Sequence, residues 1–454
     1  MMMNSTHSRI FIFSFLWVGS LGLLLQIVIL PNWPSLHAGN GLLKGGDWVW
    51  FHAEAINLAK SITENGWSVW TLRHIGNSTI SLVALAYYFT KIYSPLIILP
   101  INALLFAFSA VCIYEICRSF NERAALFSVL PFLLFPSGLM IYGQMHKDIF
   151  VVAGMGGLLL MTVAFARQKS YAWKSIVCLW LLLAFSCLLI WLSRPYLLKV
   201  TLFLMFMGFV PTCLLTFRGR QRGWWVGLMG SLVMISVTTH YLGNDGPAHF
   251  ERDGPTILSN DSASNPNTGN ETNLANSVLD DKLDKSGSYP WMMQYVTRIA
   301  DVRKGFTQYG GSTIDSKVRF DSVGALLSYL PRALQIALFS PFPSQWFATA
   351  ETPGGQLMRT VSAVEMIITY VCLLGLVVGL IPRHWKNPAL WVSILIALTL
   401  TTIQALVFAN IGTLYRMRFI SWHLLTALGI IGWYFIMDGK FQRRRHKVVI
   451  GESS

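Results

Sequence analysis

The chain has 454 residues, of which 54% are hydrophobic and only 12% are charged. Soluble domains usually carry about 25% charged residues, so this composition excludes an ordinary soluble enzyme. The mean hydropathy is +0.51, and several apolar runs approach the length of about 20 residues that a bilayer requires. Lipid is therefore the expected surroundings for most of the protein.

Much of the net charge of +14 comes from lysines and arginines in short polar segments next to the apolar runs. These segments hold 16 of the 35 lysines and arginines but only three acids, and they cover residues 1–9, 118–123, 167–174, 218–222, 383–386 and 438–454. Positive loops of this kind are typical of the cytoplasmic side of a membrane protein. We therefore expect no nucleic acid partner.

The hydropathy pattern predicts an all-α, polytopic transmembrane protein with about ten spans. The predicted spans cover residues 10–30, 94–117, 124–143, 149–166, 174–193, 196–217, 223–243, 362–382, 389–409 and 418–437. With the N-terminus in the cytoplasm, all six basic segments fall on the inner side. The prediction is thus an integral, multi-pass protein whose N- and C-termini are both cytoplasmic.

Two stretches on the outer side are predicted to be more than simple loops. The first outer loop, 31–93, contains a tryptophan-rich amphipathic stretch at Trp48–Trp70 and an apolar stretch at Thr79–Thr90 that is too short to cross a bilayer. We expect both to form juxtamembrane helices. The large outer loop, 244–361, begins with a polar part that we predict to be partly disordered. Its later part includes an amphipathic stretch at Val323–Phe339.

These features divide the chain into an N-terminal transmembrane region, 1–243, the outer (periplasmic) loop, 244–361, and a C-terminal transmembrane region, 362–454. The last of these ends in a basic cytoplasmic tail. Gly154, Gly156 and Gly157 are expected at close contacts between helices, because small residues let helices approach in a membrane.

Two acids on the outer side are candidate catalytic residues. Asp148 is the only carboxylate between Arg123 and Asn244, and a charge among so many apolar residues is costly unless it has a function or a partner. Asp47 follows two glycines and precedes the first outer helix. The structural alternatives are helix capping for either acid, and an ion pair between Lys147 and Asp148.

Basic and polar side chains on the same side complete the candidate site. Arg416 and Arg418 lie where the outer end of one predicted span turns into the next, and guanidinium groups bind phosphate well; their alternative role is that of boundary residues whose charged ends reach water. The same alternative holds for Arg194. We assign to substrate binding the polar residues His52, Glu54, His146 and Tyr415.

Several common catalytic motifs are missing from the sequence. There is no GxSxG, Walker A, HExxH or CxxC motif, which disfavours serine hydrolysis, ATP-driven transport and zinc proteolysis. The six cysteines all fall in apolar runs and lack metal-ligand spacing. No metal-ligating residues are therefore assigned.

The order of these features resembles the GT-C superfamily of polytopic membrane glycosyltransferases, which includes protein O-mannosyltransferases and the lipid A aminoarabinose transferase. The resemblance rests on Gly45–His52 in the first outer loop, Leu134–Gly138, and His146–Asp148, over roughly residues 10–170. In that family one acid follows the first span and a second follows the third, where Asp47 and Asp148 stand here.

The resemblance implies a GT-C-like fold and an enzyme that transfers a sugar from a polyprenyl-phosphate donor on the outer face of the membrane. The acceptor would be a cell-envelope glycan, lipid or protein. From the outward position of such a site we expect the bacterial inner membrane. Asp47 would be the general base, and Asp148 would orient the acceptor or assist that base. Lys147, Arg194, Arg416 and Arg418 would stabilise the departing phosphate, and single displacement would invert the sugar's configuration. No cofactor is assigned, although a divalent cation would be compatible.

Two other functions remain open at the level of sequence. A polysaccharide polymerase or ligase acting on polyprenyl-pyrophosphate-linked chains would also have about ten spans and a large late outer loop. A lipid-linked sugar flippase or transporter would place charges near the middle of the membrane. Glu115 and Glu365 lie near the ends of their predicted spans, which favours neither residue as a transport site.

Overall fold

The computed structural model describes residues 5–167, 173–195, 197–198, 290–308, 312–350 and 353–451. Within these ranges the protein is helical, and the only β structure is two isolated bridges. Five of the described helical segments are long and apolar enough to cross a membrane. They are Ser5–Ile29, Pro95–Arg118, Gly354–His384, Pro388–Val407 and Phe419–Asp438. The apolar helices support a membrane-embedded protein.

The N-terminal region contains the first nine helices. In chain order they are α1 (Ser5–Leu23, continued by a π-helical turn at Leu24–Ile29), α2 (Asp47–Asn65), α3 (Ser78–Thr90), α4 (Leu99–Arg118), α5 (Glu122–Ser128), α6 (Leu130–Leu134), α7 (Gly138–Tyr142), α8 (Asp148–Arg167) and α9 (Trp173–Ser193). Single 3-10 turns lie at Trp67–Val69, His74–Gly76 and Pro95–Ile98.

The described residues from 290 onward contain two groups of helices. The first group is α13 (Pro290–Gln308), α14 (Val323–Ser328) and α15 (Leu330–Phe339), followed by a 3-10 turn at Pro343–Gln345. The second group is α16 (Pro353–Gly375, with a π-helical turn at Leu376–Leu380), α17 (Ile381–His384), α18 (Pro388–Val407), α19 (Ile411–Met417) and α20 (Phe419–Gly451).

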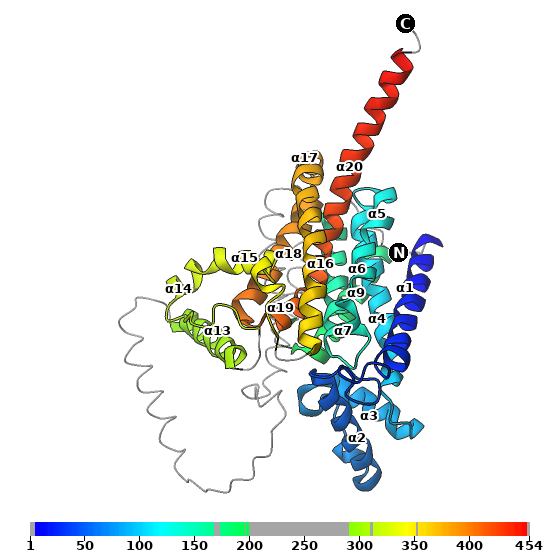
Figure 1. The fold of residues 1–454 in the computed structure, drawn as a ribbon, viewed down its shortest axis with the longest axis vertical. Helices are drawn as coiled ribbons and strands as arrows, with labels where there is room; N and C mark the ends of the chain where they lie inside the picture. Colours follow the sequence, from blue (N-terminus) through cyan, green and yellow to red (C-terminus); the bar gives the residue numbers. More distant parts are fainter. Residues whose placement is uncertain are drawn as a thin grey trace.

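The long apolar helices form one bundle with a shared core. In the N-terminal half α1 packs on α4, α4 on α8 and α8 on α9, and in the C-terminal half α16 and α18 pack on α20. Helix α18 also contacts α8, which joins the two halves. Figure 1 shows α2 and α3 at one end of this bundle, whereas α5 and α17 lie at the other end.

Glycines set the closest helix contacts. A Cβ atom on Gly432 of α20 would lie 1.9 Å from the carbonyl oxygen of Gly375 on α16, so only glycine fits. Between α8 and α9, a Cβ atom on Gly154 would meet Ile190 at 2.6 Å, and one on Gly157 would meet Ser186 at 2.1 Å. These two positions behave as the sequence predicts, since small residues permit close helix approach in membranes.

The elements outside the bundle have cores of their own. Helices α2 and α3 pack on each other around Trp48, Phe51 and Tyr87, so both stretches that the sequence predicts to be helical are helical. Helices α13 and α15 pack on α18, and α14 connects to both of them away from the bundle (Figure 1). The guanidinium group of Arg303 on α13 donates to the carbonyls of Ala405 and Leu406 at the end of α18, which holds this group against the bundle.

One expected span is broken in the structure. Residues 124–143 form α5, α6 and α7 instead of one helix, because Pro131 and Pro136 lack the N–H that a continuous helix needs. The amphipathic stretch Val323–Phe339 is helical, as α14 and α15 with Tyr329 between them. The expected spans at 223–243 and most of 196–217, and the polar part of the outer loop, lie outside the described residues.

Candidate functional site

Five predicted site residues come together at the end of the bundle that carries α2. Asp47 is the first residue of α2, His146 precedes α8, and Asp148 begins α8. Arg194 directly follows α9, and Arg416 lies in α19. Together they form a continuous polar chain, which we call the outer cluster, in the order Asp47, Arg416, His146, Asp148 and Arg194.

The inner part of the outer cluster is a buried ion pair. Oδ1 of Asp148 accepts hydrogen bonds from Nε and Nη2 of Arg194 at 2.9 and 2.8 Å. The Asp148 side chain is 1% exposed and that of Arg194 is 12% exposed. Burial alone would raise the pKa of this carboxyl, but Arg194 and its other neighbours outweigh burial and hold the pKa below its ordinary value. Asp148 is therefore ionised and paired.

His146 connects the buried pair to Arg416. Its Nδ1 lies 3.3 Å from Oδ2 of Asp148, and its Nε2 contacts Nη1 of Arg416. A guanidinium group can only donate, so Nε2 must accept and the ring proton must lie on Nδ1, facing Asp148. The backbone N–H of Asp148, 3.1 Å from Nδ1, would suit the opposite tautomer, but that tautomer would place two donors against each other at Arg416.

The protein keeps His146 neutral. The side chain is fully buried, and the rings of Trp48 and Phe51 lie 5.7 and 6.4 Å from it, centroid to centroid. Burial, and after it the charges of Arg416 and Arg194, lower the pKa of His146 to about 3, against the opposing effect of Asp148. A neutral imidazole can therefore stand between two arginines without adding a third positive charge.

The open part of the outer cluster is the pair Asp47 and Arg416. Oδ2 of Asp47 lies 3.8 Å from Nη1 of Arg416, and the side chains are 36% and 23% exposed. They are the most exposed of the five, so solutes reach this pair first. Gly46 caps α2 in extended conformation, and a Cβ atom there would lie 2.1 Å from the Trp48 ring, so glycine is required beside Asp47.

Three further predicted site residues lie close to members of the outer cluster in the sequence: His52 and Glu54 belong to α2, and Lys147 stands between His146 and Asp148. Nδ1 of His52 lies 2.8 Å from the Tyr87 hydroxyl, and its Nε2 lies 3.3 Å from Nδ2 of Asn40, so this side chain ties α2 to α3 and to the preceding loop. Glu54 is half-buried two turns beyond Asp47. The Lys147 ammonium lies 5.4 Å from the ring centroid of Phe51.

Arg418 lies apart from the outer cluster, although only two residues separate it from Arg416. It is fully buried, and its guanidinium group donates to the carbonyls of Ile336, Ala337 and Ser340 at the end of α15. The ring of Trp422 lies 4.9 Å from it. Arg418 therefore stabilises the end of α15. The structure gives no support for its expected contact with phosphate.

Tyr415 belongs to a second polar group, whose acid the sequence reasoning did not select. The Tyr415 hydroxyl donates to Oε2 of Glu365 at 2.5 Å, and the backbone N–H of Ser137 donates to Oε1 at 2.8 Å. Glu365 is the only acid between Glu351 and Asp438. The isolation that selected Asp148 would therefore have selected Glu365 as well.

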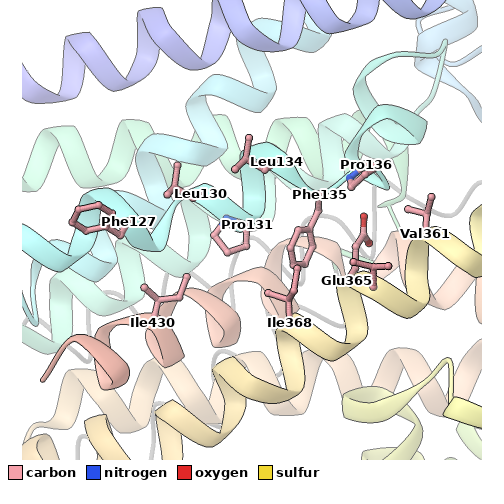
Figure 2. Close-up of a pocket in the computed structure, with 11 residues that line it drawn as sticks. Phe127, Leu130, Pro131, Leu134, Phe135, Pro136, Val361, Glu365, Ile368 and Ile430 are labelled. Carbon is pink, nitrogen blue, oxygen red and sulfur yellow. The ribbon is translucent and has the colours of Figure 1, made fainter. Parts of the chain in front are cut away.

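Glu365 also lines an apolar groove of about 550 Å³. The groove lies between the α5–α6 segment, α16 and α20 (Figure 2). Phe127 and Ile430 line one end of it, whereas Pro136, Val361 and Glu365 line the other end. On one side the lining runs from Phe127 in α5 to Pro136, which lies between α6 and α7.

Among the described residues, no group of three or more His, Cys, Asp or Glu side chains is placed to hold a metal ion. No protein-family model, curated protein or solved structure matches the chain.

Proposed function

We propose that the protein is a membrane glycosyltransferase with a GT-C-like fold of about ten spans. It would transfer a sugar from a polyprenyl-phosphate donor to a cell-envelope acceptor on the outer face of the bacterial inner membrane. The observation that carries this proposal is the pair Asp47 and Arg416, a carboxylate and a guanidinium 3.8 Å apart and both open to solutes. A base beside a phosphate-binding cation is the pair that this reaction requires.

In the proposed reaction, the acceptor hydroxyl attacks the anomeric carbon and its proton passes to Asp47. A bond forms between the acceptor oxygen and the sugar while the bond between the sugar and the phosphate oxygen breaks. The electron pair of that bond stays on the polyprenyl phosphate. Arg416 would bind the phosphate as its charge grows, because guanidinium stays protonated and offers several donors.

The rest of the outer cluster supports this assignment by position. Asp148 is buried and paired with Arg194, so its role is to position side chains and not to take the proton. It faces Nδ1–H of His146, whose Nε2 contacts Arg416. Asp148 would thus fix Arg416 beside Asp47 through a neutral imidazole, which leaves the positive charge of Arg416 available to phosphate.

The test is sugar transfer by the full chain in lipid nanodiscs, supplied with labelled polyprenyl-phosphate sugars and envelope glycans. Asp47→Asn should lower the transfer rate by about 10²–10⁴-fold, the usual contribution of a general base, without lowering the melting temperature. Glu64→Gln, which changes an exposed acid on the same helix, is the control and should transfer at the wild-type rate.

Other results would redirect the proposal. Transfer that requires a pyrophosphate-linked oligosaccharide would indicate a polymerase or ligase. A wild-type protein that moves the donor across the bilayer but transfers nothing would indicate a flippase. Transfer by Asp47→Asn at the wild-type rate would remove Asp47 as the base.

A further inference from the structure

The groove beside α16 has the surface that a hydrocarbon chain requires. Apart from Glu365, every residue that lines it is apolar. Phe127, Leu134 and Val364 are 57%, 55% and 58% exposed, so the groove opens on the outside of the bundle. That surface faces lipid in a membrane protein, so a membrane lipid can enter the groove sideways with one of its chains.

The polar end of the groove selects the head group. Both oxygens of Glu365 accept hydrogen bonds, from the Ser137 N–H and the Tyr415 hydroxyl, and neither donates in these contacts. None of the lining residues is Lys, Arg or His. A phosphate head would therefore meet a carboxyl group without a cation in the lining. A hydroxyl group would instead find an acceptor with lone pairs to spare.

The polar end is also next to the outer cluster. Tyr415, which contacts Glu365, directly precedes Arg416 in α19, and Arg416 contacts Asp47 and His146. A head group held at Glu365 would therefore lie against the residue that directly precedes Arg416 in α19. The outer cluster and the groove therefore suit different groups. The cations of the outer cluster suit the donor phosphate, and the polar end of the groove suits a hydroxyl.

We propose that this groove binds a membrane lipid with an uncharged, hydroxyl-bearing head group such as diacylglycerol, one chain along the groove and its hydroxyl at Glu365. The proposed binding of this lipid rests on the lining of the groove and not on the proposed function. The further statement that this lipid is the sugar acceptor rests on the proposed function, in which its hydroxyl leaves Glu365 and gives its proton to Asp47.

Photo-crosslinking of the full chain in phosphatidylcholine nanodiscs tests the binding. The probes are a diacylglycerol with a photoactivatable group in one chain and a phosphatidic acid with the same chains. Diacylglycerol should label peptides from 127–136 and 361–368. Phosphatidic acid should label them about tenfold less, the worth of one hydrogen bond to a charged group. Equal labelling by the two probes would overturn the proposal.

Two variants at the groove make the test specific. Ile368→Trp fills the groove and should abolish the labelling, whereas Ile367→Trp, at the neighbouring exposed position outside the groove, should leave it unchanged. Glu365→Gln should reduce the preference for diacylglycerol over phosphatidic acid, with folding checked by thermal melting. Unchanged labelling in Ile368→Trp would show that the lipid binds elsewhere and would refute the proposal.

The crosslinking contains no sugar donor, so its result is independent of transferase activity. Specific labelling without any sugar transfer would leave the lipid site standing and remove the proposed function. Sugar transfer without specific labelling would support the proposed function and remove the lipid site. Transfer of labelled sugar to diacylglycerol by the wild type, lost in Ile368→Trp and kept in Ile367→Trp, would establish both.

Discussion

His146 should make the protein less stable in mild acid. A histidine in an unfolded chain has a pKa near 6.5, whereas burial lowers the pKa of His146 to about 3. Between these two values the unfolded chain binds more protons than the folded protein, so stability falls as the pH falls. The contribution is fully present above about pH 6.5 and is lost progressively below it.

The loss of unfolding free energy depends on the pKa of His146 in the unfolded chain, because its pKa in the folded protein lies below the pH range of the experiment. Each pH unit below 6.5 is worth about 1.4 kcal/mol, so acidification from about pH 8 to pH 5 should remove about 2 kcal/mol of unfolding free energy. Replacing His146 by Gln should remove this loss. The Gln carbonyl can accept from Arg416, and its NH2 group can donate to Asp148.

The assay is reversible unfolding by SDS titration in mixed micelles at both pH values, for the wild type, His146→Gln and His74→Gln. The stability difference between wild type and His146→Gln should change by about 2 kcal/mol between the two pH values. His74 lies outside the outer cluster, and its replacement serves as the control for loss of a histidine. A difference between wild type and His146→Gln that does not change with pH would refute the protonation argument.

Three further predictions concern stability. Arg194→Met leaves the Asp148 carboxylate buried without its main partner and should cost about 3 kcal/mol of unfolding free energy in SDS. The double variant with Asp148→Asn should recover more than half of this loss. Strictly additive losses in the two single variants and the double variant would contradict the pairing. Arg418→Met should lower the melting temperature, yet its folded fraction should transfer sugar at the wild-type rate; a transfer defect in that fraction would place Arg418 in the site. Gly432→Ala should prevent close contact of α16 and α20 and cost about 3 kcal/mol or more, whereas Gly305→Ala, with open space around its Cβ, should cost little in the same melting experiment.

Much of the fold could be predicted because the bilayer restricts the choices. Apolar runs such as 94–117 and 389–409 match α4 with its leading turn and α18 to within two residues, since a helix satisfies its own backbone groups in lipid. The run 124–143 has the same apolar character, but it contains two prolines. A proline can kink a membrane helix or end it, and neighbouring helices decide which, so the sequence alone could not predict the groove.

The candidate site shows a similar limit. The isolation of Asp148 and the positions of Arg194 and Asp47 at helix ends identified groups that the structure brings together. The sequence did not separate Arg416 from Arg418, and helical geometry explains the difference. Two residues apart along a helix correspond to a rotation of about 200°, so the two side chains point to opposite sides of α19. One reaches the outer cluster, and the other reaches the end of α15.

The order of synthesis has a consequence for the outer cluster. Asp47, His146, Asp148 and Arg194 all come from the first half of the chain, and Arg416 follows His146 by 270 residues. The turn before α19 also takes its backbone partners from an earlier segment, since the Ile314 N–H donates to Ala409 and the Ile411 N–H donates to Ser312. A ribosome therefore completes the side of the site that we propose for phosphate only near the end of translation. Until then, a nascent chain would hold the acids of the site in the membrane without the arginine that the open carboxylate faces.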